Sequence, residues 1–169
     1  MVNWRERLHL TSAGEAREEA LRSLPDVIND LTAVAVVRNN ITDTSGRIWA
    51  QEHSELVFRD EFVPALDGLN GFSHVFVLTW LDQVTDEGRA LLRIRPTGDE
   101  SSPEVGVFAT RTAHRPNPLS ISIVPLEGVK GNIVRVVGLD VVNGTPVLDI
   151  KPYVSFYDSF TSELPSWAE

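Results

Sequence analysis

Residues 106–118 (GVFATRTAHRPNP) combine two arginines, a histidine and two prolines in one short stretch. A strand is predicted to lead into this loop, in which Pro116 and Pro118 restrict the backbone. A restrained loop can present the guanidinium groups of Arg111 and Arg115 to a carboxylate or a phosphate at low entropic cost. The same residues also fit a rigid corner whose arginines donate to backbone carbonyls. The spacing leaves both interpretations open.

A second polar segment, residues 143–153 (NGTPVLDIKPY), follows a predicted strand. Side chains two positions apart in a strand share a face. One face of this strand would therefore carry a carboxylate, an ammonium and a phenol, from Asp149, Lys151 and Tyr153. These groups could bind a polar ligand or transfer protons, or could form a solvated face with an ion pair. Leu148 and Ile150 would point into the core, and Asn143-Gly144 is typical of a type I′ hairpin turn.

A third segment, residues 68–74 (GLNGFSH), enters a long apolar run. Ser73 and His74 could border a site at the start of that strand, although a single histidine there is more often a structural residue. The four histidines lie far apart without HxxxH or HExxH spacing, and there is no cysteine, so no metal site is expected. The sequence also lacks GxGxxG, Walker A and GxSxG motifs, which disfavours Rossmann, P-loop and α/β-hydrolase chemistry.

The composition is that of one ordinary globular domain. The chain has 169 residues, 42% of them hydrophobic, and a net charge of −9. No apolar run approaches the roughly 18 residues that span a bilayer, and no signal peptide is visible, so a cytoplasmic location is expected. Residues 105–139 carry four basic residues against Glu127, a local charge of +3, from Arg111, Arg115, Lys130 and Arg135. A local basic site on an acidic body is possible, but an extensive nucleic-acid surface is disfavoured.

The elements that position these segments are mostly short strands between turn residues. Strands are predicted at residues 33–38, 55–58, 74–81, 90–95, 106–110, 119–126, 133–142 and 146–150. A helix is predicted over residues 12–24 and a short one over residues 62–66. We therefore expect a mainly β protein, a small antiparallel β-barrel with an N-terminal helix and one or two short helices. The expected organisation is an N-terminal extension (1–30), a barrel domain (31–160) and a C-terminal tail (161–169).

Four stretches together carry a family resemblance. They are residues 34–38, GLNGFSHVFVLTWL, GVFATRTAHRPNP with the following LSIS, and GLDVVNGTPVLDIKPY. In this order, over residues 33–157, they resemble the TsaA-like family, also called TrmO. The resemblance implies a small β-barrel methyltransferase that uses S-adenosylmethionine without a Rossmann domain. It also implies a homodimer that methylates the exocyclic amine of threonylcarbamoyladenosine beside the anticodon of tRNA.

The resemblance also implies site residues. Cofactor contacts would come from Asn39, Asn40, Ile41, Ser73, His74, Arg111, Ile121, Asn143, Gly144, Thr145 and Pro146. In this scheme Arg111 holds the methionyl carboxylate and the NGTP turn binds the adenine or ribose. Substrate contacts would come from Arg115, Asn117, Lys151 and Tyr153. No catalytic base is assigned: Asp149 is the nearest candidate, with Lys151 and Tyr153, and a structural carboxylate explains Asp149 equally well.

The chain departs from the family pattern at three places. Asn39-Asn40 replace Ser-Pro, Ser120 replaces a glycine, and Asn143 replaces an aspartate. These changes do not alter the predicted fold, but they bear on the substrate. Two functions therefore stay open. One is a tRNA methyltransferase, and the other is an S-adenosylmethionine-binding barrel that acts on another substrate or serves as a non-catalytic sensor.

Overall fold

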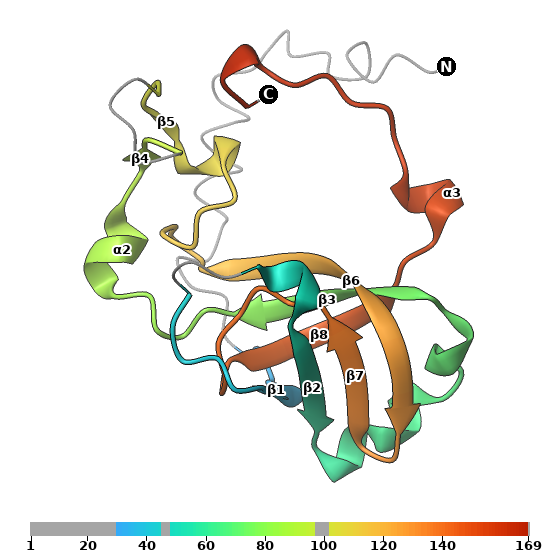
Figure 1. Cartoon of the computed structure of the whole chain (residues 1–169). Helices are drawn as coiled ribbons and strands as arrows, with labels where there is room; N and C mark the ends of the chain where they lie inside the picture. Colours follow the sequence, from blue (N-terminus) through green and yellow to red (C-terminus); the bar gives the residue numbers. More distant parts are fainter. Residues whose placement is uncertain (1–29, 45–47, 97–101, 169) are drawn as a thin grey trace, which may run out of the picture. The chain divides into compact units, whose positions relative to one another are not determined.

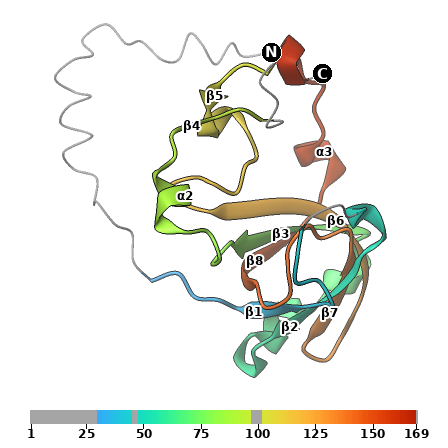
Figure 2. The same ribbon diagram turned by 60° about the vertical axis from the view of Figure 1, so that its left-hand side comes forward.

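The computed structural model describes residues 30–44, 48–96 and 102–168 (Figures 1 and 2). The helix predicted over residues 12–24 lies outside these ranges. The barrel belongs to one compact unit, Thr32–Glu169. The predicted boundaries of the extension and the tail stay predictions.

Six antiparallel strands close into a barrel in the order β1-β2-β7-β6-β3-β8 (Figure 1). The strands are β1 (Ala35–Arg38), β2 (His53–Phe58), β3 (His74–Trp80), β6 (Leu119–Lys130), β7 (Ile133–Val137) and β8 (Pro146–Pro152). Closure leaves none of these strands as a free edge, which protects the exposed backbone groups that an open sheet would present. The prediction of a mainly β antiparallel barrel is confirmed.

The barrel interior is filled by alternate residues of each strand. In β2, Leu56 and Phe58 are buried while Val57 faces outward, and in β3 Val75 and Val77 are buried. This alternation follows from the pleat, which sends successive side chains to opposite faces. Branched aliphatic side chains dominate the interior because they pack well on a pleated surface.

Strand β8 closes the barrel by pairing with β1, and its pairing with β3 on the other side contains an irregularity. Ala35 pairs with Val147, and Thr79 of β3 also pairs with Val147, whereas Leu78 pairs with Asp149. Leu148 is therefore the extra residue of a β-bulge, and the bulge shifts the inward face of β8. The prediction that Leu148 points into the core is wrong, because Val147 takes that place, while Ile150 packs against the core as expected.

The remaining elements are short. The helices are α2 (Asp86–Ala90) and α3 (Ser155–Asp158), and the 3-10 helices are η2 (Trp49–Gln51), η3 (Asp60–Leu66), η4 (Leu69–Gly71), η5 (Val107–Ala109) and η6 (Ser166–Ala168). The short helix predicted at residues 62–66 is confirmed as η3. A separate two-stranded sheet joins β4 (Arg93–Ile94) and β5 (Val105–Gly106). In the described ranges, no helix has the length and apolar character needed to cross a membrane.

Three predicted strands are wrong in extent. Of the strand predicted at residues 90–95, only the two residues of β4 are in a strand. Helix α2 comes before β4, and the Thr85 hydroxyl caps the N-terminus of that helix. Residues 106–110 turn into η5, where the Thr110 hydroxyl donates to the Val107 carbonyl. Strand β7 ends at Val137 because Gly138 adopts a φ of +85°, which a β-strand does not allow.

Replacing Leu56 by alanine should lower the free energy of unfolding by about 2–5 kcal/mol, since the side chain is fully buried. Val57→Ala, on the outward face of the same strand, should cost about 1 kcal/mol or less. Urea unfolding followed by circular dichroism measures both. Equal losses in the two variants would contradict the inward and outward assignment of β2.

Candidate functional site

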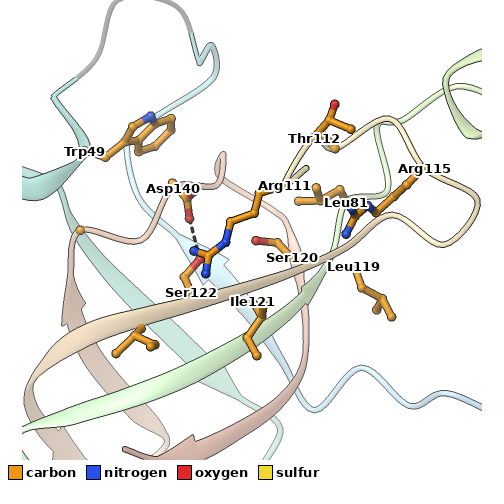
Figure 3. Close-up of a pocket in the computed structure, with 13 residues that line it drawn as sticks. Trp49, Leu81, Arg111, Thr112, Arg115, Leu119, Ser120, Ile121, Ser122 and Asp140 are labelled. Atoms are coloured by element: carbon orange, nitrogen blue, oxygen red, sulfur yellow. Dashed lines mark hydrogen bonds between the residues drawn. The ribbon is translucent and has the colours of Figure 1, made fainter. Parts of the chain in front are cut away.

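A cavity of about 410 Å³ opens beside the first half of β6 (Figure 3). Loop 110–118, the start of β6, the connection after β7, and η2 provide its walls. The lining residues are Trp49, Leu81, Arg111, Thr112, Ala113, Arg115, Leu119, Ser120, Ile121, Ser122, Ile123, Gly138 and Asp140. Gly138 lies close to η2, since a Cβ there would be 3.7 Å from the Ala50 Cα. The close approach brings η2 to the cavity.

The Arg111 side chain extends from its loop toward Ser122 and Asp140 (Figure 3). Its guanidinium group is exposed and has no hydrogen-bond or ion-pair partner among the described residues. An unpaired guanidinium at a cavity can bind a carboxylate or phosphate through two parallel hydrogen bonds. Arg111 therefore has the free donors that a ligand-binding role requires.

Arg115 is used differently. Its Nη2 donates to the Val107 carbonyl at 2.9 Å and to the Thr110 carbonyl at 2.7 Å. The Thr112 hydroxyl further stiffens the loop by accepting from the His114 amide. Arg115 thus holds the corner together, as the alternative interpretation of this loop stated, and these donors are not available to the substrate contact predicted for it. Arg115 thus fits the rigid-corner interpretation of residues 106–118, whereas Arg111 keeps the free donors that the binding interpretation needs.

A second cavity, of about 210 Å³, adjoins the first. It is lined by Thr44, Leu81, Asp82, Gln83, Val84, Ala113, His114, Asp140, Val141, Val142 and Thr145. Leu81, Ala113 and Asp140 line both cavities. The site is therefore a pair of neighbouring compartments at the end of the barrel where β3 finishes.

Asp140 lies in the wall that the two cavities share, and its Oδ1 accepts a hydrogen bond from the buried Ser122 hydroxyl at 2.6 Å. Sequence reasoning missed this residue because a strand was predicted to run to residue 142. Gly138, which ends β7, is the signal that could have indicated a loop here. The loop leaves the Asp140 carboxylate exposed at the site.

Asn39, Ile41 and Asn143, which were predicted to contact the cofactor, are joined to one another by hydrogen bonds. The Asn39 amide nitrogen Nδ2 donates to Ser54 Oγ and to the Val141 carbonyl, both at 3.1 Å, and its Oδ1 accepts from the Ile41 amide. Asn143 Oδ1 accepts from the Asn39 amide, and the Asn143 amide donates to the Ile41 carbonyl. This network joins the end of β1 to the turn before β8, which is a structural role.

The turn at Asn143-Gly144 is not the predicted type I′ hairpin. Only Gly144 has a positive φ, of +87°, whereas type I′ requires one at both central residues. Moreover, β7 and β8 on its two sides are not neighbours in the barrel. Of the NGTP residues, Thr145 lines the second cavity, and Pro146 pairs with Val36 at the barrel seam.

Asn39 and Asn40 line a different cavity, of about 550 Å³, on the flank of the barrel. In this cavity, the hydrogen bond from Arg38 and, to a smaller extent, the hydrogen bond from Arg135 hold the pKa of Glu55 below its ordinary value. Both arginines are thereby engaged. The structure does not bring Asn39 or Asn40 into either of the two neighbouring compartments.

Ser73 and His74 lie at the opposite end of β3 from Leu81, about 20 Å along the strand at 3.3 Å per residue. The Tyr153 amide donates to the His74 carbonyl at 3.0 Å, so Tyr153 lies at that end as well. The structure therefore separates these three predicted site residues from Arg111 and Ile121, which line the first cavity.

Asp149 and Lys151 form an ion pair of 2.6 Å on the outer face of β8. The Asp149 Oδ1 also accepts from the Ile150 amide. These contacts match the alternative of a solvated face with an ion pair. Asn117, another predicted substrate contact, is exposed, and its carbonyl accepts from the Leu119 amide at the entrance to β6.

The basic stretch of residues 105–139 does not form one patch. Arg111 and Arg115 lie at the start of β6, whereas Lys130 is the last residue of that strand. Arg135 Nε is 3.0 Å from Glu55 Oε1 on the barrel flank. Within the part of the chain that the structure describes, no three His, Asp or Glu side chains gather as a metal site.

Comparison of this chain with known proteins identifies a family to which it is similar. The model of the tRNA-methyltransferase O N-terminal domain matches residues 38–159. A probable S-adenosyl-L-methionine-binding protein of Archaeoglobus fulgidus is 39% identical over 144 residues, covering 82% of this chain and 38% of that protein. The tRNA (adenine(37)-N6)-methyltransferase of Escherichia coli is 41% identical over 109 residues, covering 62% of this chain and 46% of that protein.

Solved structures agree with this match. A crystal structure of TrmO superposes with a TM-score of 0.66 at 33% identity, covering 83% of this chain and 64% of that chain. The chain spans less than half the length of the curated relatives from Archaeoglobus fulgidus and Escherichia coli. Because the family model covers more than half of the chain and the barrel agrees with the solved fold, the chain belongs to the tRNA-methyltransferase O family through that family's N-terminal domain.

Proposed function

We propose that this chain is an S-adenosylmethionine-dependent methyltransferase that modifies the exocyclic amine of an adenosine in tRNA. The observation that carries the proposal is the unpaired guanidinium of Arg111 at a cavity of about 410 Å³. Relatives named as S-adenosylmethionine-binding proteins and as a tRNA (adenine(37)-N6)-methyltransferase support it. The proposed substrate is threonylcarbamoyladenosine next to the anticodon.

The residues of the first cavity fit this cofactor. Its volume lies within the roughly 300–1,000 Å³ typical of small-molecule sites. Arg111 offers donors for the methionyl carboxylate, and Leu81 and Ile121 offer apolar surface. The cofactor would supply a methyl group on a sulfonium, so the protein needs to supply no metal.

The chain's own task is to hold donor and acceptor next to each other. Methyl transfer requires the acceptor nitrogen in line with the bond that breaks, and positioning lowers the barrier substantially. The second cavity adjoins the first along Leu81, Ala113 and Asp140, so an acceptor held there would face a donor held in the first. Arg115 contributes by keeping the wall between residues 107 and 115 rigid.

Arg111→Ala should weaken binding of S-adenosylmethionine by about 1.5–3 kcal/mol, because charged hydrogen bonds to the carboxylate are lost. Arg59→Ala is the matched control, since Arg59 is exposed and lies outside both compartments. Isothermal titration calorimetry measures the affinities. A wild-type protein without cofactor binding, or an Arg111→Ala protein with wild-type affinity, would contradict the assignment.

The tRNA substrate is supported by the activity in the name of the Escherichia coli relative. The scattered cations favour a second candidate, transfer to a smaller acceptor. Arg111, Lys130 and Arg59 are the described arginine and lysine side chains without a hydrogen-bond, ion-pair or ring contact, and they lie on different elements. Few phosphates can therefore be contacted near the site by the described residues. If the substrate is tRNA, as the first candidate has it, we propose that the footprint is small and lies around the anticodon, with a cytoplasmic site of action.

Incubation of the purified protein with tRNA and methyl-labelled cofactor should place the label on threonylcarbamoyladenosine. Mass spectrometry of the digested nucleosides identifies the product. The control is tRNA that carries unmodified adenosine at the same position, which should remain unlabelled. If cofactor binds but no tRNA nucleoside is labelled, the acceptor is a smaller molecule or the barrel is a sensor.

We further propose a homodimer, as the family resemblance implies. Four apolar residues near the C-terminus are exposed and suit an interface: Phe156, Tyr157, Phe160 and Leu164. Trp167 is half-buried instead and lines a cavity with Phe108. On the outer face of β6, Leu119, Ile121 and Ile123 add apolar surface. Exposed apolar surface of this extent is typical of association sites.

Light scattering at micromolar concentration should report twice the mass of one chain. The double variant Phe156→Ser and Phe160→Ser should shift the protein toward the monomer, because both rings are about four-fifths exposed. Ile48→Ser, which removes a similarly exposed side chain far from the tail in sequence, should leave the mass unchanged. A monomeric wild type is the result that would count against the dimer.

A further inference from the structure

We propose that Asp140 accepts the proton that the acceptor nitrogen releases during methyl transfer. This inference rests on the proposed function and names a residue for its chemistry. The carboxylate lies in the wall common to both cavities, beside Leu81 and Ala113. Neither of those two neighbours has an ionisable group, so Asp140 is the shared residue that can take up a proton.

The Asp140 carboxylate is positioned by the barrel itself. Its Oδ1 accepts from Ser122 Oγ at 2.6 Å, and Ser122 is a nearly buried residue of β6. Within the described residues, the other oxygen, Oδ2, has no hydrogen-bond partner. A strand of the barrel thus orients one oxygen, while the other is unpaired and can accept a hydrogen bond, as a proton acceptor requires.

The other charged or titratable groups that line the two cavities are less suited to this role. Arg111 and Arg115 stay protonated, and Arg115 is bound to backbone carbonyls. Asp82 and His114 line the second cavity but not the first. Asp140 is the acidic residue that lines both.

The proton balance of the transfer is as follows. When bound, the cofactor would supply a methyl group from its sulfonium, and the electron pair of the broken C–S bond would stay on sulfur. The lone pair of the exocyclic nitrogen forms the new N–C bond, and the N–H electron pair remains on nitrogen. The released proton passes to the Asp140 carboxylate, which becomes a neutral acid. The sulfonium charge and the carboxylate charge are both lost, so the step conserves charge.

Asp140→Asn tests this role, because asparagine has the same size but does not take up the proton. Single-turnover methylation should slow by about 100-fold or more. The matched control is Asp67→Asn, an exposed carboxylate after η3 that lies outside both cavities, with a rate equal to wild type. Melting temperature and affinity for S-adenosylhomocysteine should be unchanged in both variants.

A binding measurement tests the same contact without turnover. With S-adenosylhomocysteine bound, the wild type should bind a threonylcarbamoyladenosine stem-loop about tenfold more tightly than its N6-methylated form, in which N6 has no hydrogen to donate. Asp140→Asn should reduce this preference about threefold or more, because a hydrogen bond to a neutral amide is weaker. Fluorescence anisotropy measures both affinities.

The outcomes separate the two proposals. A wild type that methylates tRNA while Asp140→Asn keeps its rate and its binding preference overturns the inference alone. A wild type that transfers no methyl group overturns the proposed function together with the inference. Should Asp140→Asn fail to fold, Ser122→Ala keeps the carboxylate and removes its donor. A rate about tenfold lower with unchanged cofactor affinity then supports the role, and an unchanged rate overturns it.

Discussion

Closure of the sheet between its first and last strands is the constraint on which the site depends. Strand β1 is only four residues long, and it pairs with β8 through Ala35 and Val36. The Val37 amide donates to the Thr145 carbonyl, and the Asn39 network continues the same junction beyond the strands. Because this seam places the turn before β8 beside the end of β1, it also holds the connection that carries Asp140. Asn39 and Asn143 therefore contribute directly to the closure of the barrel.

The arginines of loop 110–118 show how one short motif can hold both a structural and a binding group. Arg115 donates twice to the backbone and keeps the corner rigid, whereas Arg111 remains unpaired and exposed. A free guanidinium is useful to a ligand only where its backbone is well held, because an ordering cost would otherwise reduce the affinity. The first arginine could not present its charge as effectively without the second.

Much of the fold could be predicted from the sequence, since β2, β3 and β6 have clear apolar alternation or long apolar runs. For the candidate site, the loop motif indicated Arg111 and the family resemblance indicated Ile121, and both line the first cavity. Spacing could not distinguish Arg111 from Arg115, because the difference depends on which carbonyls lie within reach. Asp140 could not be found from a strand pattern, since one glycine with a positive φ ends β7 early. The inward face of β8 was misassigned at Leu148 because a β-bulge leaves no periodic signal.

The distribution of charge indicates how an acidic chain could act on an anionic substrate. The net charge is −9, and Arg38 and Arg135 are engaged by Glu55 on the barrel flank. Long-range attraction by the described residues is therefore weak, and recognition depends on contacts made at short range inside the compartments. Here the unpaired cation of Arg111 and the carboxylate of Asp140 lie along one cavity. A site with both signs of charge suits a reaction in which a cationic donor and a proton-releasing acceptor meet, because each charge is stabilised only where it is needed.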